Sequence, residues 1–365
     1  MLKVTINDIV PGAVVAKSIY NEDGVLLAPN GMILREKGIR RLEDLGIHQA
    51  YVVYPESGTS KILEMYEESP HLDDIICKNT RIQAQKLIKK VMNRVLPEKS
   101  INLDKISKMV EEVIEQLLSA KEIMLTLSRL RTIDDYTYEH SVNVCVFSLV
   151  IGMDMNLPMS ELKLLGTGAL LHDIGKVCIS EDVLKKPSSL TREEFDEVKS
   201  HTELGYQILL KSGVSEEVAQ IALYHHEKYD GTGYNRCLHG EEIPLWSRIV
   251  TLADSYDAMS SDRVYRKRFS PDKVYKEIAC LSGQHFDYDI TERFLRRIDL
   301  YPIGTGVLLN TNHKGVVVAQ NKFLPQSPII RIFKDKNNPH NIEDGEDYVD
   351  IDMSKTKYLF IKDTF

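Results

Sequence analysis

The chain has 365 residues, of which 43% are hydrophobic and 27% charged, so it is long enough for two or three domains that each bury a core. This composition excludes wholesale disorder and a fibrous class. The formal net charge of -8 argues against a general binder of DNA or RNA, because the chain has no excess of cations with which to displace phosphate counterions. An anionic substrate would need a local basic or metallic site.

The amino-terminal sequence predicts neither export nor membrane insertion. Its start, MLKVTINDIVPGAVV, lacks the basic region and long apolar core of a secretory signal. The longest apolar run, Val142 to Met153, is too short to cross a bilayer. The five cysteines never form a CxxC pair: Cys77, Cys145, Cys178, Cys237 and Cys280. We therefore expect a cytoplasmic protein with reduced thiols rather than a disulfide framework or a cysteine zinc site.

Residues 1–54 predict a small α+β module. The segments AVVAKSIY and VLLA flank the turn NEDG, REKGIRRLEDLG is typical of a helix, and QAYVVY has the pattern of a returning strand. The module has no catalytic pattern. Its sequence leaves open whether it is a dimerisation element, a sensor or a docking surface for a partner protein.

The segment 55–130 is interpreted as a linker, marked by PESGTS, followed by signalling or dimerisation helices. Four apolar residues recur there at the spacing of one helical face: Ile106, Val110, Val113 and Leu117. Such a stripe is most often core. It also suits a helix that pairs two chains or passes a signal inward, and on that interpretation we expect a homodimer.

Residues 131–300 have an almost entirely helical pattern. Beyond them, the short runs GTGVLLN, GVVVAQN, PIIRIF and KYLFIKD predict a small β-rich module over 301–365, whose role the sequence also leaves open. The expected fold class is therefore mainly α, with a small α+β module before the helices and a β-rich module after them.

The stretch LLHDIGK places His172 and Asp173 directly behind two leucines. Burying an unpaired imidazole or carboxylate costs several kcal/mol, and a metal ion would compensate for that cost. An isolated pair of this kind is more often at the surface. If the two residues share one helix, their side chains lie about 100° apart and can straddle two ions, with Lys176 on the face of His172.

Further histidines with acidic neighbours follow the same helical region. Each of these histidines alone is weak evidence for a metal site, because a single helical histidine is more often a core or surface residue than a ligand. Seven candidates sit beside apolar helical faces: His140, His172, Asp173, His201, His225, His226 and Asp254. Seven nitrogen and oxygen ligands exceed the need of one tetrahedral ion and suit two ions bridged by a carboxylate, for which Asp173 is the natural candidate. The absence of a thiolate favours iron or manganese, with zinc as an alternative.

The region 131–300 resembles the HD-GYP family of the HD phosphohydrolase superfamily. Besides HDIGK, the motifs HSVNV, HTELGYQIL, HHEKYDGTGYN with LHGEEIP, and RIVTLADSYDAMSSDRVYR follow in the family's order and approximate spacing. The resemblance implies an HD-type helical domain that hydrolyses cyclic di-GMP, a bacterial second messenger, to linear pGpG and in some members on to GMP. It implies metal ligands at all seven residues named above.

The resemblance also implies roles in catalysis and substrate binding. Asp173 and Lys176 would act at the metals and the phosphate, and Arg263 and Arg266 would hold the phosphates of the substrate. Two divalent ions are implied, with Fe or Mn favoured and Zn, Ni, Co or Mg as alternatives.

One motif departs from the family pattern, because Asn235 follows Gly233 and Tyr234 where the family has proline. Asparagine lacks the fixed φ of proline but is itself a good turn residue. Gly233 and Tyr234 are candidate substrate contacts. Tyr234 is equally well interpreted as a packing residue.

The number of metals is a separate prediction. Relatives that hold three ions have a glutamate four residues before the first histidine, and here that position is Tyr136. Asp135 and Glu139 point to other sides of a regular helix. We therefore expect two ions, and hydrolysis that ends mainly at pGpG.

The sequence leaves two alternative functions open. The same metal centre could act on another cyclic dinucleotide or nucleotide. A receptor or adaptor that binds the nucleotide without cleaving it belongs to a different class, and the complete set of ligand candidates speaks against it.

Overall fold

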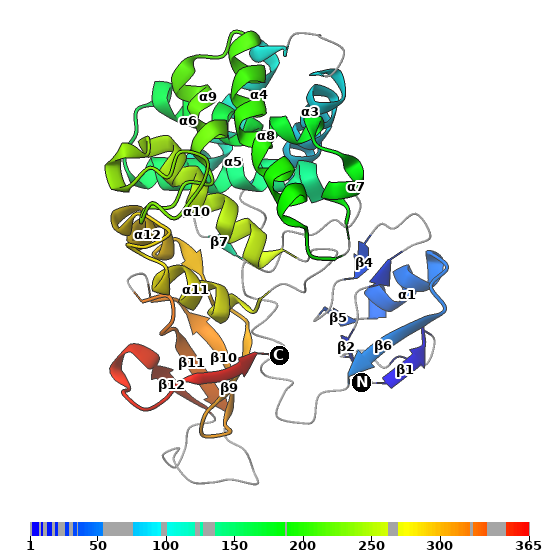
Figure 1. Ribbon diagram of the computed structural model, residues 1–365. Helices are drawn as coiled ribbons and strands as arrows, with labels where there is room; N and C mark the ends of the chain where they lie inside the picture. The colour runs from blue at the N-terminus through cyan, green and yellow to red at the C-terminus, as the bar shows by residue number, and fades with distance from the viewer. Residues whose placement is uncertain are drawn as a thin grey trace. The chain divides into compact units, whose positions relative to one another are not determined.

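The computed structural model describes residues 2–364 except 7–8, 10–12, 17–18, 21–25, 29–31, 35, 54–75, 96–100, 121–124, 127–135, 187, 262–268, 322–323 and 334–347. The chain divides into two compact units (Figure 1). The β unit comprises residues 1–71, 301–321 and 327–365. The helical unit comprises residues 72–300 and 322–326.

The amino-terminal part of the β unit is the predicted α+β module. Its four-stranded sheet has the order β1-β6-β2-β5, and β3 pairs with β4 separately. The bounds are β1 Leu2–Thr5, β2 Ala13–Val15, β3 Ile19–Tyr20, β4 Leu26–Ala28, β5 Ile33–Leu34, α1 Glu36–Asp44 and β6 Gln49–Val53. A small core forms because the sheet and α1 bury apolar side chains such as Val15, Leu34 and Leu42.

The carboxy-terminal part of the β unit is an antiparallel sheet of five strands in the order β12-β11-β10-β9-β13. The bounds are β9 Gly306–Leu309, β10 Lys314–Ala319, β11 Ile329–Phe333, β12 Tyr348–Asp352 and β13 Ile361–Thr364. Arg331 and Asp350 face each other across β11 and β12 with two contacts of 2.6 and 2.7 Å. The expectation of a β-rich carboxy-terminal module is therefore confirmed.

The helical unit carries the motifs. Its elements are α3 Lys78–Val95, α4 Leu103–Ser119, β7 Leu125–Thr126, α5 Tyr136–Asp154, α6 Met159–Leu171, the 3-10 helix η2 Ile174–Cys178, α7 Glu181–Leu184, α8 Arg192–Lys211, α9 Glu216–Tyr224, the 3-10 helix η3 Gly240–Glu242, α10 Leu245–Ser260, α11 Pro271–Cys280, α12 Tyr288–Leu295 and β8 Ile298–Asp299. Helix α5 is buried on all sides over 139–151 and contacts α3, α4, α6, α10 and α12. An apolar helix of this kind belongs at the centre of a helical domain.

The apolar stripe of α4 lies in the core of the same chain. Val110 and Leu117 have no exposed surface, and Ile106 and Val113 are equally buried beside α3, α5 and α6. This overturns the interpretation of the stripe as an interface between two chains, because its side chains are already covered within the helical unit. The expected homodimer stays a prediction without support from this stripe.

Among the described helices, none is long and apolar enough to cross a membrane. The apolar run Val142 to Met153 lies within α5. All five cysteines have free thiols, and only Cys145 is buried.

Candidate metal centre

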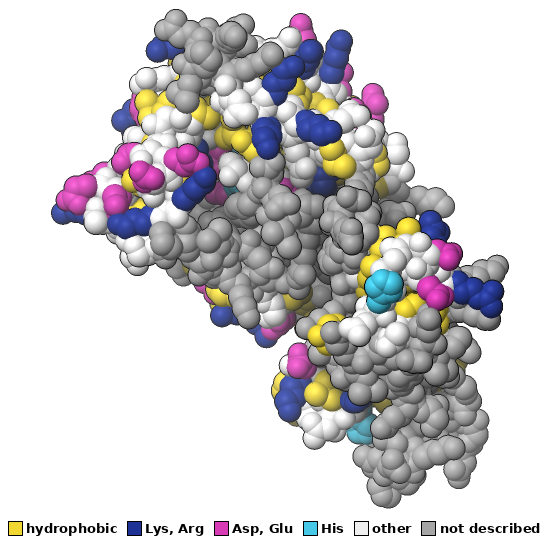
Figure 2. Space-filling view, turned by 90° about the vertical axis from the view of Figure 1, so that its right-hand side faces the viewer, with side chains coloured by type: hydrophobic (Ala, Val, Ile, Leu, Met, Phe, Trp, Pro, Cys, Tyr) yellow, Lys and Arg dark blue, Asp and Glu magenta, His cyan; other side chains and the backbone are white. Residues whose placement is uncertain are grey.

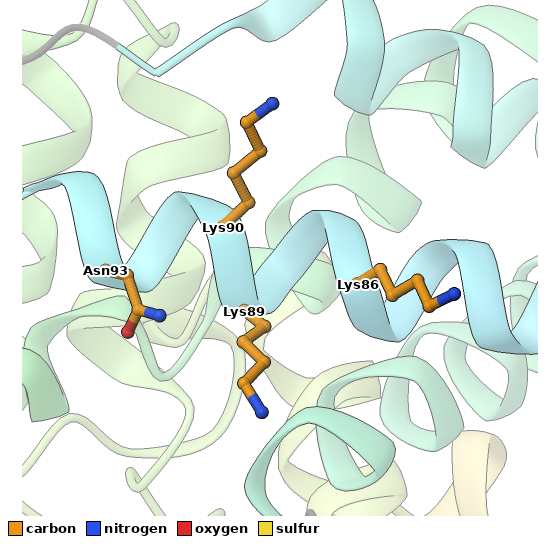
Figure 3. A pocket seen from close by; sticks show the side chains of 4 residues that line it. All are labelled: Lys86, Lys89, Lys90 and Asn93. Atoms are coloured by element: carbon orange, nitrogen blue, oxygen red, sulfur yellow. The ribbon is translucent and has the colours of Figure 1, made fainter.

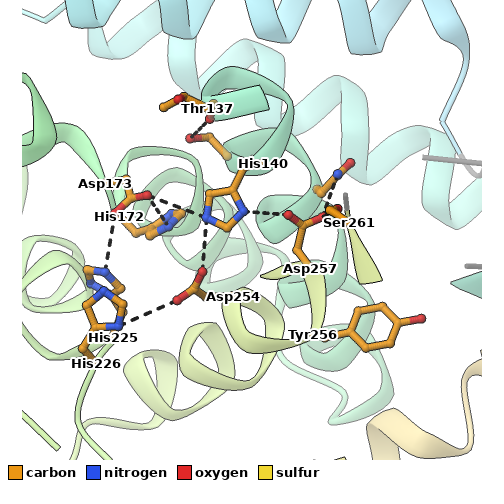
Figure 4. A network of polar contacts seen from close by, with 12 residues as sticks. Thr137, His140, His172, Asp173, His225, His226, Asp254, Tyr256, Asp257 and Ser261 are labelled. Atoms are coloured by element: carbon orange, nitrogen blue, oxygen red, sulfur yellow. Dashed lines mark hydrogen bonds and ion pairs between the residues drawn. The ribbon is translucent and has the colours of Figure 1, made fainter. Parts of the chain in front are cut away.

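All seven predicted ligands meet in one cluster inside the helical unit. Figure 4 shows six of them, all except His201. They come from α5, the end of α6, α8, the end of α9, and α10. His140, His172, Asp173, His201 and His225 are almost fully buried. The side chains of His226 and Asp254 are 26% and 13% exposed, so the cluster reaches solvent at these two residues.

Two groups of ligand atoms can be distinguished. The first cluster is His140, His172 and Asp254, and the second cluster is His201, His225 and His226. Within each cluster the candidate ligand atoms lie within 4.8 Å of one another. That spacing suits three donors around a single ion.

Asp173 lies between the two clusters. Its Oδ2 is 3.7 Å from Nε2 of His140 and 3.4 Å from Nε2 of His172, both in the first cluster. Its Oδ1 is 3.4 Å from Nε2 of His201 and 3.7 Å from Nε2 of His225, both in the second. Each carboxylate oxygen thus faces a different cluster, as a bridging ligand requires.

The residues present fit a metal centre. Nε2 of His172 and Oδ1 of Asp173 are buried polar atoms without a hydrogen-bond partner among the described residues. Leaving such atoms unsatisfied costs about 1–3 kcal/mol each, so their retention needs an explanation. Imidazole nitrogens and carboxylate oxygens are common ligands of divalent transition metals.

Three histidines are oriented by carbonyl groups of their own helices. Nδ1 of His172 donates to the carbonyl of Ala169 at 2.7 Å. Nδ1 of His201 and Nδ1 of His225 donate in the same way to Val198 and Ala222, at 2.5 and 2.9 Å. Because Nδ1 carries the proton in each ring, the lone pair of Nε2 faces the cluster.

The ends of two helices also favour a cation. His172 is the residue that caps the carboxy-terminal end of α6, and His225 caps that of α9. The carboxy-terminal end of a helix carries a partial negative charge, which stabilises a positive ion beside it. This arrangement corrects the expectation that His172 and Asp173 share one helix, because α6 ends at Leu171 and Asp173 begins the turn into η2.

Burial and charge set the protonation of the cluster. Burial lowers the pKa of His201 to about 4, and it also lowers the pKa values of His225 and His226, so these rings are neutral at pH 7. For Asp173, burial opposes ionisation, but Lys176 and His172 hold its pKa well below the ordinary value. A buried, ionised carboxylate beside neutral imidazoles is ready to bind a cation.

His140 differs from the three histidines of the second cluster. Burial opposes its charged form, but hydrogen bonds to Asp254 and Asp257 outweigh burial and raise its pKa to about 9. Nδ1 of His140 lies 2.7 Å from Oδ2 of Asp257, and its Nε2 lies 3.1 Å from Oδ1 of Asp254. Asp257 therefore orients this ring from α10.

Lys176 is placed on Asp173 rather than on the face of His172. Its Nζ lies 2.5 Å from Oδ2 of Asp173, and its side chain is 29% exposed. This contact corrects the expectation drawn from a continuous helix. Arg263 and Arg266, the predicted phosphate ligands, lie outside the described residues.

The loop after α9 lies against the second cluster. The ring of Tyr234 is centred 4.9 Å from the ring of His226. Gly233 leaves no room for a side chain, because a Cβ there would lie 2.6 Å from the carbonyl oxygen of His226 and against backbone atoms of Glu227 and Lys228. The amide of Asn235 donates to the hydroxyl of Thr202 on α8.

Sequence reasoning missed two buried carboxylates. Glu227 is fully buried and accepts from the backbone N–H groups of Arg236 and Leu238 at 2.6 and 3.2 Å, which holds the loop after α9 in place. Asp257 orients His140. Their positions in the sequence could have pointed to them, because Glu227 directly follows the candidate ligand His226 and Asp257 comes one helical turn after the candidate ligand Asp254.

The residues that bear on a third ion are only partly described. Asp135 and the side chain of Tyr136 lie outside the described residues. Glu139 is buried and belongs to none of the ligand groups found among the described residues. The number of ions stays a prediction.

Two family models match the chain. One, described as HD domain, matches residues 108–290, about half of the chain. The chain belongs to the HD domain family. All seven ligand candidates of this HD domain fall within the match. A second model, described as a KOW domain associated with HD domain, matches residues 306–365, which form the five-stranded sheet.

Curated relatives resemble part of this HD domain protein. A cyclic di-GMP phosphodiesterase of Pseudomonas aeruginosa is 36% identical over 228 residues, which are 62% of this chain and 55% of that protein. A 3'3'-cGAMP-specific phosphodiesterase of Vibrio cholerae is 41% identical over 139 residues, which are 38% of this chain and 30% of that protein. The chain thus spans about half the length of the first relative and less of the second.

A solved structure shares the fold. The HDG"Y"P protein from Bdellovibrio bacteriovorus matches with a TM-score of 0.50 and 17% identity, and the match covers 80% of this chain and 98% of that chain. The mainly α fold and the resemblance to HD-GYP proteins are confirmed.

A hollow along α3 is separate from the ligand clusters. It has a volume of about 340 Å³ and is lined by Lys86, Lys89, Lys90 and Asn93 (Figure 3). Lys and Arg side chains also gather over the helical unit on the face seen in Figure 2. In Figure 3 the three ammonium groups point apart, so they do not converge on one anion.

Proposed function

We propose that this HD domain is a metal-dependent phosphodiesterase that hydrolyses cyclic di-GMP to linear pGpG. The observation that carries the proposal is the position of Asp173, whose two carboxylate oxygens face two separate clusters of ligand atoms. A phosphodiester is held and attacked most readily between two adjacent cations.

We infer a dinuclear centre with Asp173 as the bridge. His140, His172 and Asp254 would complete one site, and His201, His225 and His226 the other. The ligands contain nitrogen and oxygen but no thiolate, which favours iron or manganese, with Zn, Ni, Co and Mg as alternatives. When bound, the two ions would supply Lewis-acid activation of the attacking water and of the phosphodiester.

The residues of this chain prepare the site before the substrate arrives. The helix carbonyls hold three of the rings and Asp257 holds the ring of His140, so that each Nε2 already faces the clusters. Lys176 keeps the buried carboxylate of Asp173 ionised. The partial exposure of His226 and Asp254 supplies the side from which a dinucleotide reaches the clusters.

The expected substrate contacts are Arg263, Arg266, Gly233 and Tyr234. Two guanidinium groups facing one phosphodiester would neutralise the charge that builds up in the transition state. Gly233 brings the loop after α9 close to the second cluster, and Tyr234 packs on His226 there.

The substrate class is supported by the names of the relatives. The Pseudomonas relative acts on cyclic di-GMP, and the Vibrio relative is specific for 3'3'-cGAMP. Both are cyclic dinucleotides. The 41% identity to the second relative makes 3'3'-cGAMP the second candidate substrate of the same site.

Product analysis tests the proposal. The purified full chain, reconstituted with Mn²⁺ or Fe²⁺, is incubated with cyclic di-GMP and 3'3'-cGAMP in parallel, and the products are resolved by chromatography. We expect pGpG to accumulate, with little GMP, and slower loss of 3'3'-cGAMP. Faster loss of 3'3'-cGAMP would reverse the order of the two substrates. Metal-loaded protein that binds cyclic di-GMP and leaves it intact would identify a receptor.

A further inference from the structure

A row of buried hydrogen bonds leads from the first cluster to helix α3. Nη1 of Arg81 donates to Oδ1 of Asn143 at 2.6 Å, and Nδ2 of Asn143 donates to Oδ1 of Asp257 at 2.8 Å. Oδ2 of Asp257 accepts from Nδ1 of His140 at 2.7 Å. Arg81, Asn143, Asp257 and His140 are each no more than 9% exposed.

The chemistry of the groups determines the direction of every bond in this row. A guanidinium only donates, so the carbonyl oxygen of Asn143 must face Arg81 and its NH₂ group must face Asp257. A carboxylate only accepts, so Asp257 accepts one hydrogen bond from Asn143 and one from His140. A metal ion would displace the proton on Nε2 of His140, and the remaining proton on Nδ1, held by Asp257, keeps Nε2 directed into the first cluster.

Helix α3 is itself held in place next to Arg81. The hydroxyl of Thr80 donates to Oε1 of Glu112 on α4 at 2.5 Å and accepts from Nε2 of Gln116 at 2.7 Å. The backbone N–H of Cys77 donates to Oε1 of Gln116 at 2.7 Å. Arg81 therefore starts from a fixed position on the first turn of α3, although α3 lies outside the matched 108–290 region.

We propose that Arg81 is a positioning residue for the metal ligand His140, acting through Asn143 and Asp257. The proposal rests on the dinuclear centre inferred above. Without Arg81, Asn143 can turn its amide and present the oxygen to Asp257, which loses a donor and becomes free to rotate. His140 then loses the acceptor that holds its ring.

The effect should be confined to one cluster. His201 and His225 are oriented by carbonyls of their own helices, and none of the contacts in the Arg81 row reaches them. Losing an outer partner of a ligating histidine typically weakens metal binding by about 10- to 100-fold. We therefore expect one of the two ions to bind about tenfold more weakly, while the other keeps its affinity.

Calorimetric titration with Mn²⁺ of the full chain, after removal of bound metal by chelation, tests the proposal. The variants are Arg81→Met, Arg81→Lys and Asn143→Leu. We expect Arg81→Met and Asn143→Leu each to weaken the binding of the same single ion. The double variant Arg81→Met/Asn143→Leu should weaken it little further, because both residues act in one row. Arg81→Lys should recover part of the affinity.

A matched control is Arg248→Met. Arg248 forms a partly buried ion pair with Asp287 at 2.5 Å and is not a member of the row, so this variant also loses an arginine charge and its packing. It should leave both Mn²⁺ affinities unchanged.

Unchanged affinities in all Arg81 and Asn143 variants would overturn the proposal. So would equal weakening of both ions together with a lower melting temperature, because that pattern describes a purely structural arginine. If the wild-type chain bound no Mn²⁺, the metal centre itself would fail, and this outcome is seen before any variant is compared.

Discussion

His140 of the first cluster is oriented across the tertiary structure, whereas His201 and His225 of the second cluster are oriented within single helices. His140 on α5 depends on Asp257 of α10, a residue 117 positions away along the chain. His201 and His225 depend on carbonyls only three residues before them. The second cluster can therefore form wherever its helices form, while the first also requires correct packing of α3, α5 and α10.

Asp173→Asn should have the largest effect, because it changes the residue whose two carboxylate oxygens face the two clusters. The amide keeps the volume of the carboxylate but loses its charge, and an amide nitrogen is not a metal ligand. We expect hydrolysis of cyclic di-GMP to be abolished and the affinity for both ions to fall. Elemental analysis of the purified variant measures the metal content directly. Wild-type turnover with full metal content would refute the bridging role of Asp173.

Asp254→Asn and His226→Ala should each disturb one cluster. Asp254 belongs to the first cluster and His226 to the second, and both side chains are partly exposed, so neither change creates a large buried cavity. We expect each single variant to retain about one ion per chain and to lose hydrolysis, since both ions are needed. Loss of both ions in either variant would mean that the clusters are not independent.

Four of the seven ligand candidates could be found from the sequence because the two adjacent pairs, His172 with Asp173 and His225 with His226, are visible in a few consecutive residues. The sequence did not identify the Arg81 row, because Arg81 and Asn143 are 62 positions apart and their contact depends on how α3 packs on α5. Local patterns report which residue types face a core, but they do not report which distant helix supplies a partner.

The same limit explains two wrong expectations. The stripe of α4 was compatible with a dimer because periodicity predicts an apolar face without naming what covers it, and here the chain's own helices do so. The HD pair was placed on a continuous helix because the apolar residues Ala169–Leu171 lead directly into it without a proline. In the structure α6 ends there, and Gly175 allows η2 to lie directly against α8.

Removal of metal should lower the stability of the helical unit alone. Each ion that binds only the folded state at about 100 times its dissociation constant contributes roughly 2.7 kcal/mol. For a unit of this size each such contribution corresponds to roughly 5–10 °C in melting temperature. Among the described residues, every candidate ligand group lies in the helical unit, so the melting temperature of the β unit should not change. Calorimetry with and without EDTA measures this, and Asp173→Asn, which should no longer respond, is the control.

Gly175→Ala should affect the second cluster more than the first. A Cβ at Gly175 would overlap the carbonyl oxygen of His201 and lie 2.6 Å from the backbone nitrogen of Gly205, and backbone atoms cannot rotate away. We expect the free energy of unfolding to fall by about 1–3 kcal/mol, and the ion bound by His201 to be weakened. Urea unfolding and Mn²⁺ titration measure the two effects.

The matched control for this change is Gly38→Ala in α1, where a Cβ would meet no atom within 4 Å. That variant should be stabilised by up to about 1 kcal/mol, because alanine favours the helix. If Gly175→Ala behaved like Gly38→Ala, the close approach of η2 and α8 would be refuted.

Tyr234→Phe should have the smallest effect, and it separates the two interpretations of this residue. Burial, together with Asp254 and Asp173, raises the pKa of Tyr234, so its hydroxyl stays neutral and is a poor metal ligand. Its ring packs on the ring of His226, a member of the second cluster. If packing is its role, Tyr234→Phe should keep turnover, KM and both metal affinities within about twofold, whereas Tyr234→Leu loses a ring contact worth about 0.5–1.5 kcal/mol and weakens only the ion of the second cluster. Steady-state kinetics and Mn²⁺ titration of both variants measure this, and a tenfold rise in KM for Tyr234→Phe alone would show instead that the hydroxyl touches the nucleotide.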